Sequence, residues 1–190
     1  MLILFIFTLT GFLLFTGRRL AKASQNSDNQ NVSPEFSKAI QSAVQLAEDG
    51  NVKAQLLLGK AYLRGQEGLP KDSVKATELF LKAAERGDPQ GQCLMGCAYY
   101  YGDGAPRDLA LAKEWFHKAA EKGEPNAQNY LGEMYEQGLG VELDLAAAFE
   151  WRRLAVESKH IPAMTRLGVA YFYGQGVMKD KKKGLVPCNI

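Results

Sequence analysis

The sequence predicts an all-α solenoid, in which pairs of helices repeat along the chain about every 36 residues. Three observations predict it. A set of fixed residue types recurs at this spacing, prolines and aspartates recur where helices would begin, and glycines recur where helices would end. Self-similarity at such a period is typical of stacked helical units, each of which buries its apolar face only against its neighbours.

Recurrent tyrosines mark the register of four copies. They are Tyr62, Tyr99, Tyr135 and Tyr171, separated by 37, 36 and 36 residues. A second glycine keeps a spacing of 36 throughout: Gly68, Gly104, Gly140 and Gly176. The third copy gives the pattern in full as Ala127-x-x-x-Leu131-Gly132-x-x-Tyr135-x-x-Gly138. A pattern held in register over four copies excludes chance similarity.

Start and stop signals divide each copy into two helices. The first helix begins near a proline (Pro89, Pro125, Pro162), which suits a first turn whose N–H groups have no partner. It stops at the glycine after the tyrosine. An aspartate then precedes the second helix as its N-cap: Asp72, Asp108, Asp144 and Asp180. Gly87 and Gly123 close the second helix in a left-handed conformation.

A glycine also recurs inside the first helix of each copy, at Gly59, Gly96, Gly132 and Gly168. Glycine in a helix interior costs about 1 kcal/mol relative to alanine, so it needs a reason. We expect it to allow the second helix to approach closely. Trp115 and Trp151 share a column with Leu79 and are interpreted as core residues.

At these positions the chain resembles the Sel-1-like repeat family, a relative of the tetratricopeptide repeats. Leu131-Gly132, Tyr135, Gly138, Gly140 and Asp144 carry the resemblance in the third copy, and Trp115-Phe116-x-Lys118-Ala119-Ala120-Glu121-x-Gly123 carries it in the second. It covers residues 52–180. The resemblance implies a right-handed α/α superhelical solenoid that binds proteins or peptides in a concave groove lined by the first helices. It also implies a scaffold or adaptor without catalytic residues, often exported in bacteria.

The two ends of the array differ. Residues 34–49 are predicted to form a capping helix, followed by repeats at about 52–87, 88–123 and 124–160 and an incomplete repeat at 161–180. Gly184 and Pro187 stand where another second helix would continue, so residues 181–190 are predicted to be a basic tail of a truncated array. The alternative is self-association through the open fourth repeat.

The N-terminus carries a targeting signal. Residues 1–17 hold no charged side chain, and Ala21-Lys22-Ala23 fits a cleavage site, so residues 1–23 are predicted to be an export signal peptide. Arg18 and Arg19 leave open an uncleaved membrane anchor with the solenoid in the cytoplasm, and this segment is then the only membrane contact. Residues 24–33 are interpreted as a disordered spacer.

Charge and cysteine content exclude several functions. The net charge of +2 includes Arg18, Arg19 and Lys22, and without them 20 basic residues face 21 acidic ones. No basic stripe favours nucleic-acid binding. Cys93 and Cys97 lie one helical turn apart without neighbouring ligands for zinc, so they are interpreted as packed thiols. We expect no metal and no cofactor.

Columns of the first helix that vary between copies are the candidate partner-binding groove, because residues free to differ do not hold the repeats together. The candidates are Lys60, Arg64, Cys97, Tyr100, Tyr101, Asn129, Glu133, Glu136, Gln137, Phe172 and Tyr173. Their aromatic, basic and acidic zones suit an extended or helical peptide. The alternative is that Tyr100 and Phe172 only pack between repeats.

Catalysis is the rival hypothesis. Some cysteine-rich secreted relatives are described as β-lactamases, but they pair cysteines in every repeat, and here only the second copy has two on its first helix. His117 and His160 lie in no catalytic motif, and no strand precedes the glycine pairs as a nucleotide fingerprint requires. The sequence therefore favours a protein-binding scaffold.

Overall fold

The computed structural model of the 190-residue chain describes residues 34–66 and 68–185. The expected signal or anchor, the spacer and the last five residues of the tail lie outside this part. The chain divides into two units, residues 1–37 and 38–190. The account below concerns the second unit, to which α2 belongs from residue 38 onward.

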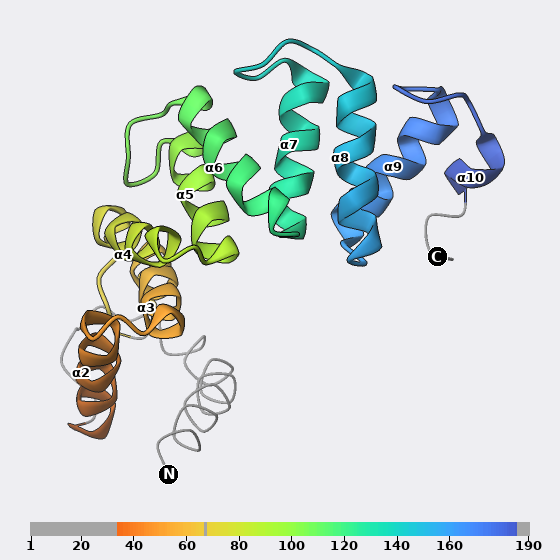
Figure 1. Ribbon diagram of the computed structural model, residues 1–190. Helices are drawn as coiled ribbons and strands as arrows, with labels where there is room; N and C mark the ends of the chain where they lie inside the picture. Colours follow the sequence, from red (N-terminus) through yellow and green to blue (C-terminus); the bar gives the residue numbers. More distant parts are fainter. Residues whose placement is uncertain (1–33, 67, 186–190) are drawn as a thin grey trace, which may run out of the picture. The chain divides into compact units, whose positions relative to one another are not determined.

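Every regular element among the described residues is a helix (Figure 1). The helices are α2 (Pro34–Glu48), α3 (Val52–Arg64), α4 (Ser73–Glu85), α5 (Pro89–Tyr101), α6 (Leu109–Glu121), α7 (Pro125–Gln137), α8 (Leu145–Glu157), α9 (Ile161–Tyr173) and α10 (Lys181–Leu185). From α3 to α9 each is 13 residues long. The prediction of an all-α repeat solenoid is confirmed.

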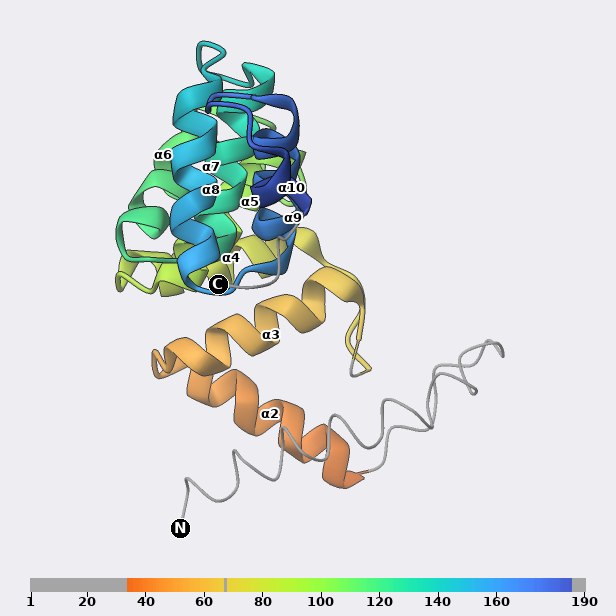
Figure 2. The same ribbon diagram turned by 90° about the vertical axis from the view of Figure 1, so that its right-hand side faces the viewer.

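Consecutive helices pack as hairpins, and each hairpin packs on the next one in the chain. The first helices of the repeats are α3, α5, α7 and α9, and the second helices are α4, α6, α8 and α10. After a quarter turn, α6 and α8 lie on one side and α5 and α9 on the other (Figure 2). The second helices α6 and α8 thus form one layer and α5 and α9 lie in the other, whereas α10 lies beside α9.

The predicted caps are present. The carboxylates of Asp72, Asp108 and Asp144 accept from backbone N–H groups in the first turns of α4, α6 and α8, at 2.9–3.0 Å. Gly87 and Gly123 take a positive φ after the second helices, whereas Lys159 takes it in the third repeat. Lysine adopts this conformation at a small cost that glycine avoids.

The interior glycines lie where the second helix presses on the first. A Cβ at Gly96 would overlap the Phe116 ring, and one at Gly132 would lie 2.8 Å from Cγ of Arg152 and 3.1 Å from the Ala148 carbonyl oxygen. The expected reason for these glycines is therefore confirmed.

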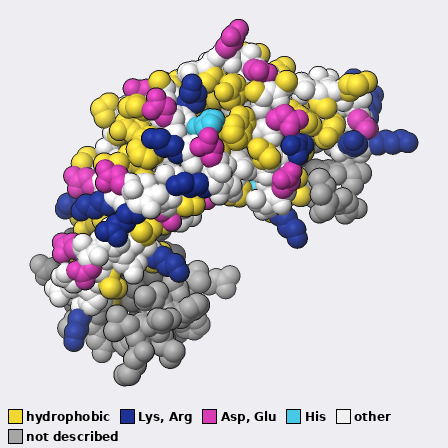
Figure 3. Space-filling view, in the orientation of Figure 1, with side chains coloured by type: hydrophobic (Ala, Val, Ile, Leu, Met, Phe, Trp, Pro, Cys, Tyr) yellow, Lys and Arg dark blue, Asp and Glu magenta, His cyan; other side chains and the backbone are white. Residues whose placement is uncertain are grey.

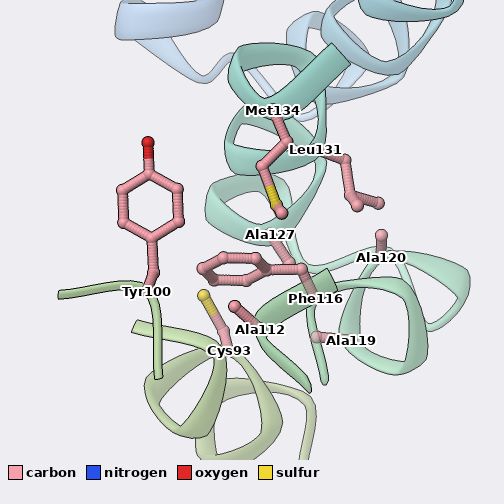
Figure 4. Packing of buried hydrophobic residues seen from close by; sticks show 9 residues of the cluster. All are labelled: Cys93, Tyr100, Ala112, Phe116, Ala119, Ala120, Ala127, Leu131 and Met134. Carbon is pink, nitrogen blue, oxygen red and sulfur yellow. The ribbon is translucent and has the colours of Figure 1, made fainter. Parts of the chain in front are cut away.

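Phe116 lies at the centre of a buried apolar cluster, among Cys93, Tyr100, Leu131 and Met134 (Figure 4). Buried alanines of α6 and α7 complete it, namely Ala112, Ala119, Ala120 and Ala127. Trp115 and Trp151 are half-buried against the apolar clusters, as expected of core residues.

Buried glutamines join consecutive repeats, a feature that the sequence analysis missed. The Nε2 group of Gln55 donates to the Ala47 carbonyl at 2.9 Å, and that of Gln128 donates to the Ala120 carbonyl at 3.2 Å. Gln92 lies at the matching position, and the fourth copy has Met164 there. Gln55 and Gln128 therefore tie their own repeats to the end of the preceding helix.

The prediction that the repeats end at residue 180 is wrong. Asp180 caps α10 by accepting from the N–H groups of Lys182 and Lys183 at 3.0 and 3.2 Å. Gly184 lies so close to α9 that a Cβ there would be 2.8 Å from Cβ of Phe172. The glycine that argued against a helix instead permits its close packing. Phe172 is consequently half-buried.

None of the helices in residues 34–66 and 68–185 combines the length and the apolar character needed to cross a bilayer.

Replacing Gly132 by leucine is predicted to push α8 away from α7, since the new side chain would meet Arg152 and the Ala148 carbonyl. We expect a loss of about 1–3 kcal/mol in the free energy of unfolding, measured by urea denaturation. Ala110→Leu, at an exposed position of α6, is the control and should change little. Unchanged stability of Gly132→Leu would refute the packing role.

A second prediction concerns pH. His160 is the N-cap of α9, and its Nδ1 accepts from Ala163 N–H at 3.3 Å. Burial lowers the pKa of His160 below its usual 6.5, although Glu124 raises it in part. The unfolded chain then binds the proton more readily than the folded one. The contribution of neutral His160 to the free energy of unfolding is therefore complete above pH 6.5 and is lost as the pH falls toward the folded-state pKa.

Chemical denaturation between about pH 7.5 and 5.5 should show a steeper loss of stability for the native chain than for His160→Asn, which keeps a capping side chain but does not titrate. Equal pH dependences would contradict this assignment.

Candidate functional site

The first-helix residues singled out in the sequence fall into three groups. Those of α5 and α7 meet, those of α3 lie beside the start of the next repeats, and Phe172 and Tyr173 pack on each other at the end of α9 with ring centroids 5.0 Å apart. On the face shown in Figure 3, basic, acidic and apolar side chains are interspersed. The centre of the site is therefore the α5–α7 face.

This face carries a cluster that we call the aromatic patch, made of Cys97, Tyr100, Tyr101, Tyr130 and Glu133. The hydroxyls of Tyr101 and Tyr130 lie 3.3 Å apart, and the Tyr130 ring stacks on Phe116 with centroids 4.7 Å apart. Tyr101 is 60% exposed, so its ring is the most accessible surface of the patch. Tyr130 was missed in the sequence because it falls outside the chosen columns.

Tyr100 departs from the expectation of a groove residue. Its ring is buried between repeats against Phe116 and Tyr130. The hydroxyl donates to Oε1 of Glu133 at 3.3 Å. Burial, with the Glu133 carboxylate beside it, raises the pKa of Tyr100 to about 12. The ring therefore packs between repeats, as the alternative interpretation expects, and a part of its hydroxyl in partner binding stays a prediction.

The two thiols of α5 are free, with Cys93 buried and Cys97 half-buried. A hydrogen bond from Cys93 lowers the pKa of Cys97, burial opposes it, and a hydrogen bond from Tyr130 adds to the lowering. In the described part of the chain, no three His, Cys, Asp or Glu side chains gather as a metal ion would need.

The α3 candidates are basic. Lys60 is half-buried, and its burial, followed by the nearby Arg64, lowers the pKa of the amine. The carboxylates of Asp88 and Glu124, which cap α5 and α7, act in the opposite direction. Lys60 therefore lies within the electrostatic influence of the acids that cap α5 and α7, while Arg64 is exposed at the end of α3.

The α7 candidates contact a residue that the sequence analysis missed, Arg152 of α8. It is only 3% exposed, and its Nη2 donates to Oε2 of Glu136 at 2.7 Å. This ion pair holds the pKa of Glu136 below its usual range. Gln137 is exposed and donates to Glu133 at 3.4 Å. The signal for Arg152 was available, since it occupies the column of Phe80 and Phe116.

Comparison with known proteins assigns the family. The profile described as "Sel1 repeat" matches residues 52–88, 89–124, 125–160 and 161–185. The chain belongs to the Sel1 repeat family. Members of this family are generally scaffolds for protein–protein interaction.

Two solved Sel1-type structures are similar to this chain. One is c5321, a protective antigen of uropathogenic Escherichia coli strains with an SLR fold, which is 40% identical and has a TM-score of 0.72, covering 81% of this chain and 32% of that one. The other is a Sel1 repeat protein from Oxalobacter formigenes, 29% identical with a TM-score of 0.70, covering 91% of this chain and 67% of that one.

Among curated proteins, the HRD3A component of an ERAD-associated E3 ubiquitin-protein ligase from Arabidopsis thaliana is 40% identical over 58 residues. The match covers 30% of this chain and only 9% of HRD3A. It therefore spans a small part of that protein.

The buried ion pair gives a testable consequence. Arg152→Phe places in the third repeat the residue that the first two repeats carry, facing the same glycine column. Replacing both members of a buried ion pair by apolar groups is often neutral or stabilising, so we expect the double variant Arg152→Phe/Glu136→Leu to unfold at equal or higher urea concentration. Glu136→Ala alone leaves the guanidinium buried without its partner and should cost about 3 kcal/mol. A marked loss of stability in the double variant would contradict this account.

Proposed function

We propose that this chain is a scaffold or adaptor that binds an extended segment of a protein partner along α5, α7 and α9. The observation that carries the proposal is the aromatic patch, in which a largely exposed tyrosine ring stands on a rigid, buried aromatic base. Exposed aromatic side chains held in place by packing supply large contact area at little entropic cost, which is typical of binding hot spots.

The polar neighbours of the patch suit a peptide. Glu133 belongs to the patch, Gln137 lies one turn further along α7, and both present hydrogen-bonding groups at its edge. Arg64 and Lys60 add positive charge on α3. A partner that combines an apolar side chain with polar backbone groups would match this surface.

The scaffold function is tested by capture of partners from the native cell extract on the immobilised protein. Tyr101→Ser and Glu133→Lys should each lower the retained partner about tenfold, as expected for hot-spot residues. Glu114→Lys, an exposed change on α6 in the other helix layer, is the matched control and should retain it fully. Equal capture by all variants would contradict the assigned surface.

The same preparation tests the enzymatic rival. Hydrolysis of a chromogenic β-lactam by the purified protein would overturn the assignment as a scaffold without catalytic residues.

We also propose that the scaffold acts in the bacterial envelope or outside the cell. The support is the uncharged segment 1–17 followed by Ala21-Lys22-Ala23. Intact-mass measurement on fractionated cells should find a periplasmic or secreted species beginning at Ser24. A membrane-bound species that retains Met1 would instead place the solenoid on an anchor, with its partner in the cytoplasm.

A further inference from the structure

A polar recess lies where three consecutive helices meet, next to the aromatic patch. It has a volume of about 190 Å³ and is lined by Asn129 and Glu133 of α7, Arg152 of α8, and Pro162 and Arg166 of α9. We call it the Arg152 recess. Figure 1 shows α7, α8 and α9 in succession, and both neighbouring pairs are in contact.

Arg152 brings a charge to a place that is apolar in the other repeats. Phe80 and Phe116 lie in its column and are fully packed. The Arg152 stem takes the place of the ring against Gly132, so the guanidinium extends beyond it to Glu136. An arginine at a core position therefore lines a surface recess.

Two buried polar atoms at this recess lack hydrogen-bond partners among the described residues. The guanidinium of Arg152 makes one hydrogen bond, from Nη2, and its buried Nε has none among the described residues. The buried Oδ1 of Asn129 has none either. Buried polar groups in native proteins are nearly always paired, so two orphans at one recess point to a ligand that completes them.

The charges decide the chemistry of that ligand. Glu136 lies under the influence of both Arg152 and Arg166, which lower the pKa of its carboxyl group. Arg166 is exposed and forms no ion pair within the part of the chain that the structure describes. Glu133 also lines the recess, and it accepts hydrogen bonds from Tyr100 and Gln137, which are neutral donors and balance no charge. Among the lining residues two guanidinium groups face this single carboxylate, so an anionic oxygen beside Arg166 and the unpaired Nε of Arg152 is the missing complement.

We propose that the Arg152 recess binds a carboxylate side chain, aspartate or glutamate, of the peptide whose apolar residue contacts the aromatic patch. The proposal rests on the scaffold function above and names the charge of the residue that the scaffold selects. Arg166 provides the exposed guanidinium, Arg152 the buried one, and Asn129 an acceptor for a peptide N–H group.

The test uses the full chain and an immobilised library of random octapeptides with one fixed position. The native protein should retain peptides with Asp or Glu at one position about tenfold better than those with Asn or Gln, because charge-assisted hydrogen bonds are the stronger ones. Arg166→Gln and Arg152→Phe should both abolish this preference. Arg153→Gln removes a charge from the next residue, which faces Glu150 and Glu157, and should leave the preference unchanged.

The outcomes separate this inference from the scaffold function. Peptides retained equally well with acid or amide at every position would overturn the recess proposal alone. Retention of no peptide would overturn both. If circular dichroism shows that Arg152→Phe has lost its helical structure, Arg166→Gln decides, since its side chain is exposed. If Arg166→Gln keeps the preference for Asp or Glu peptides, the acidic side chain binds elsewhere and the recess proposal is wrong.

Discussion

The contact between the interior glycine of each first helix and the second helix is the constraint on which the rest depends. The rings of Phe80 and Phe116 lie directly on Gly59 and Gly96, closer than any Cβ would allow. Each glycine costs about 1 kcal/mol of helix propensity, whereas a buried phenylalanine contributes about 1.5–3 kcal/mol. The exchange is favourable in the first two copies, where it fixes how closely the two helices of each repeat pack.

The same contact explains how one repeat acquires a different chemistry without changing shape. Arg152 keeps the apolar stem against Gly132 and adds a charged end beyond it. Because the apolar stem of Arg152 makes the packing contact with Gly132, its guanidinium group is available for polar contacts at the surface. A substitution at a core column thereby alters the surface of the neighbouring layer, and the cost is a buried charge that Glu136 compensates.

The fold was predictable to the level of single caps, because glycine, proline and aspartate act through local backbone geometry. Asp72 and Gly87 occupy the roles that their position alone implies. The site was less predictable. Tyr100 varies between copies yet packs inside, because variation shows only that a column lacks one fixed partner. Its contacts here are Phe116 of the same repeat and Tyr130 of the next one.

Other failures have the same origin. The buried glutamines went unnoticed because their partner is a backbone carbonyl eight residues earlier, in the preceding repeat. Gly184 was interpreted as a helix breaker, and its effect depends on the neighbouring Phe172. Sequence patterns specify how a residue affects its own backbone, and they leave open which residue of a neighbouring helix it will contact.

Met164 affects how firmly the last repeat is held to the one before it. It replaces the glutamine that ties the earlier repeats together, so the seam between α8 and α9 lacks that side-chain hydrogen bond. The Arg152 recess straddles this seam. A ligand that contacts both α7 and α9 would therefore stabilise the last repeat against local unfolding. Slower amide hydrogen exchange along α9 would then report that the recess is occupied, even at residues that do not touch the ligand.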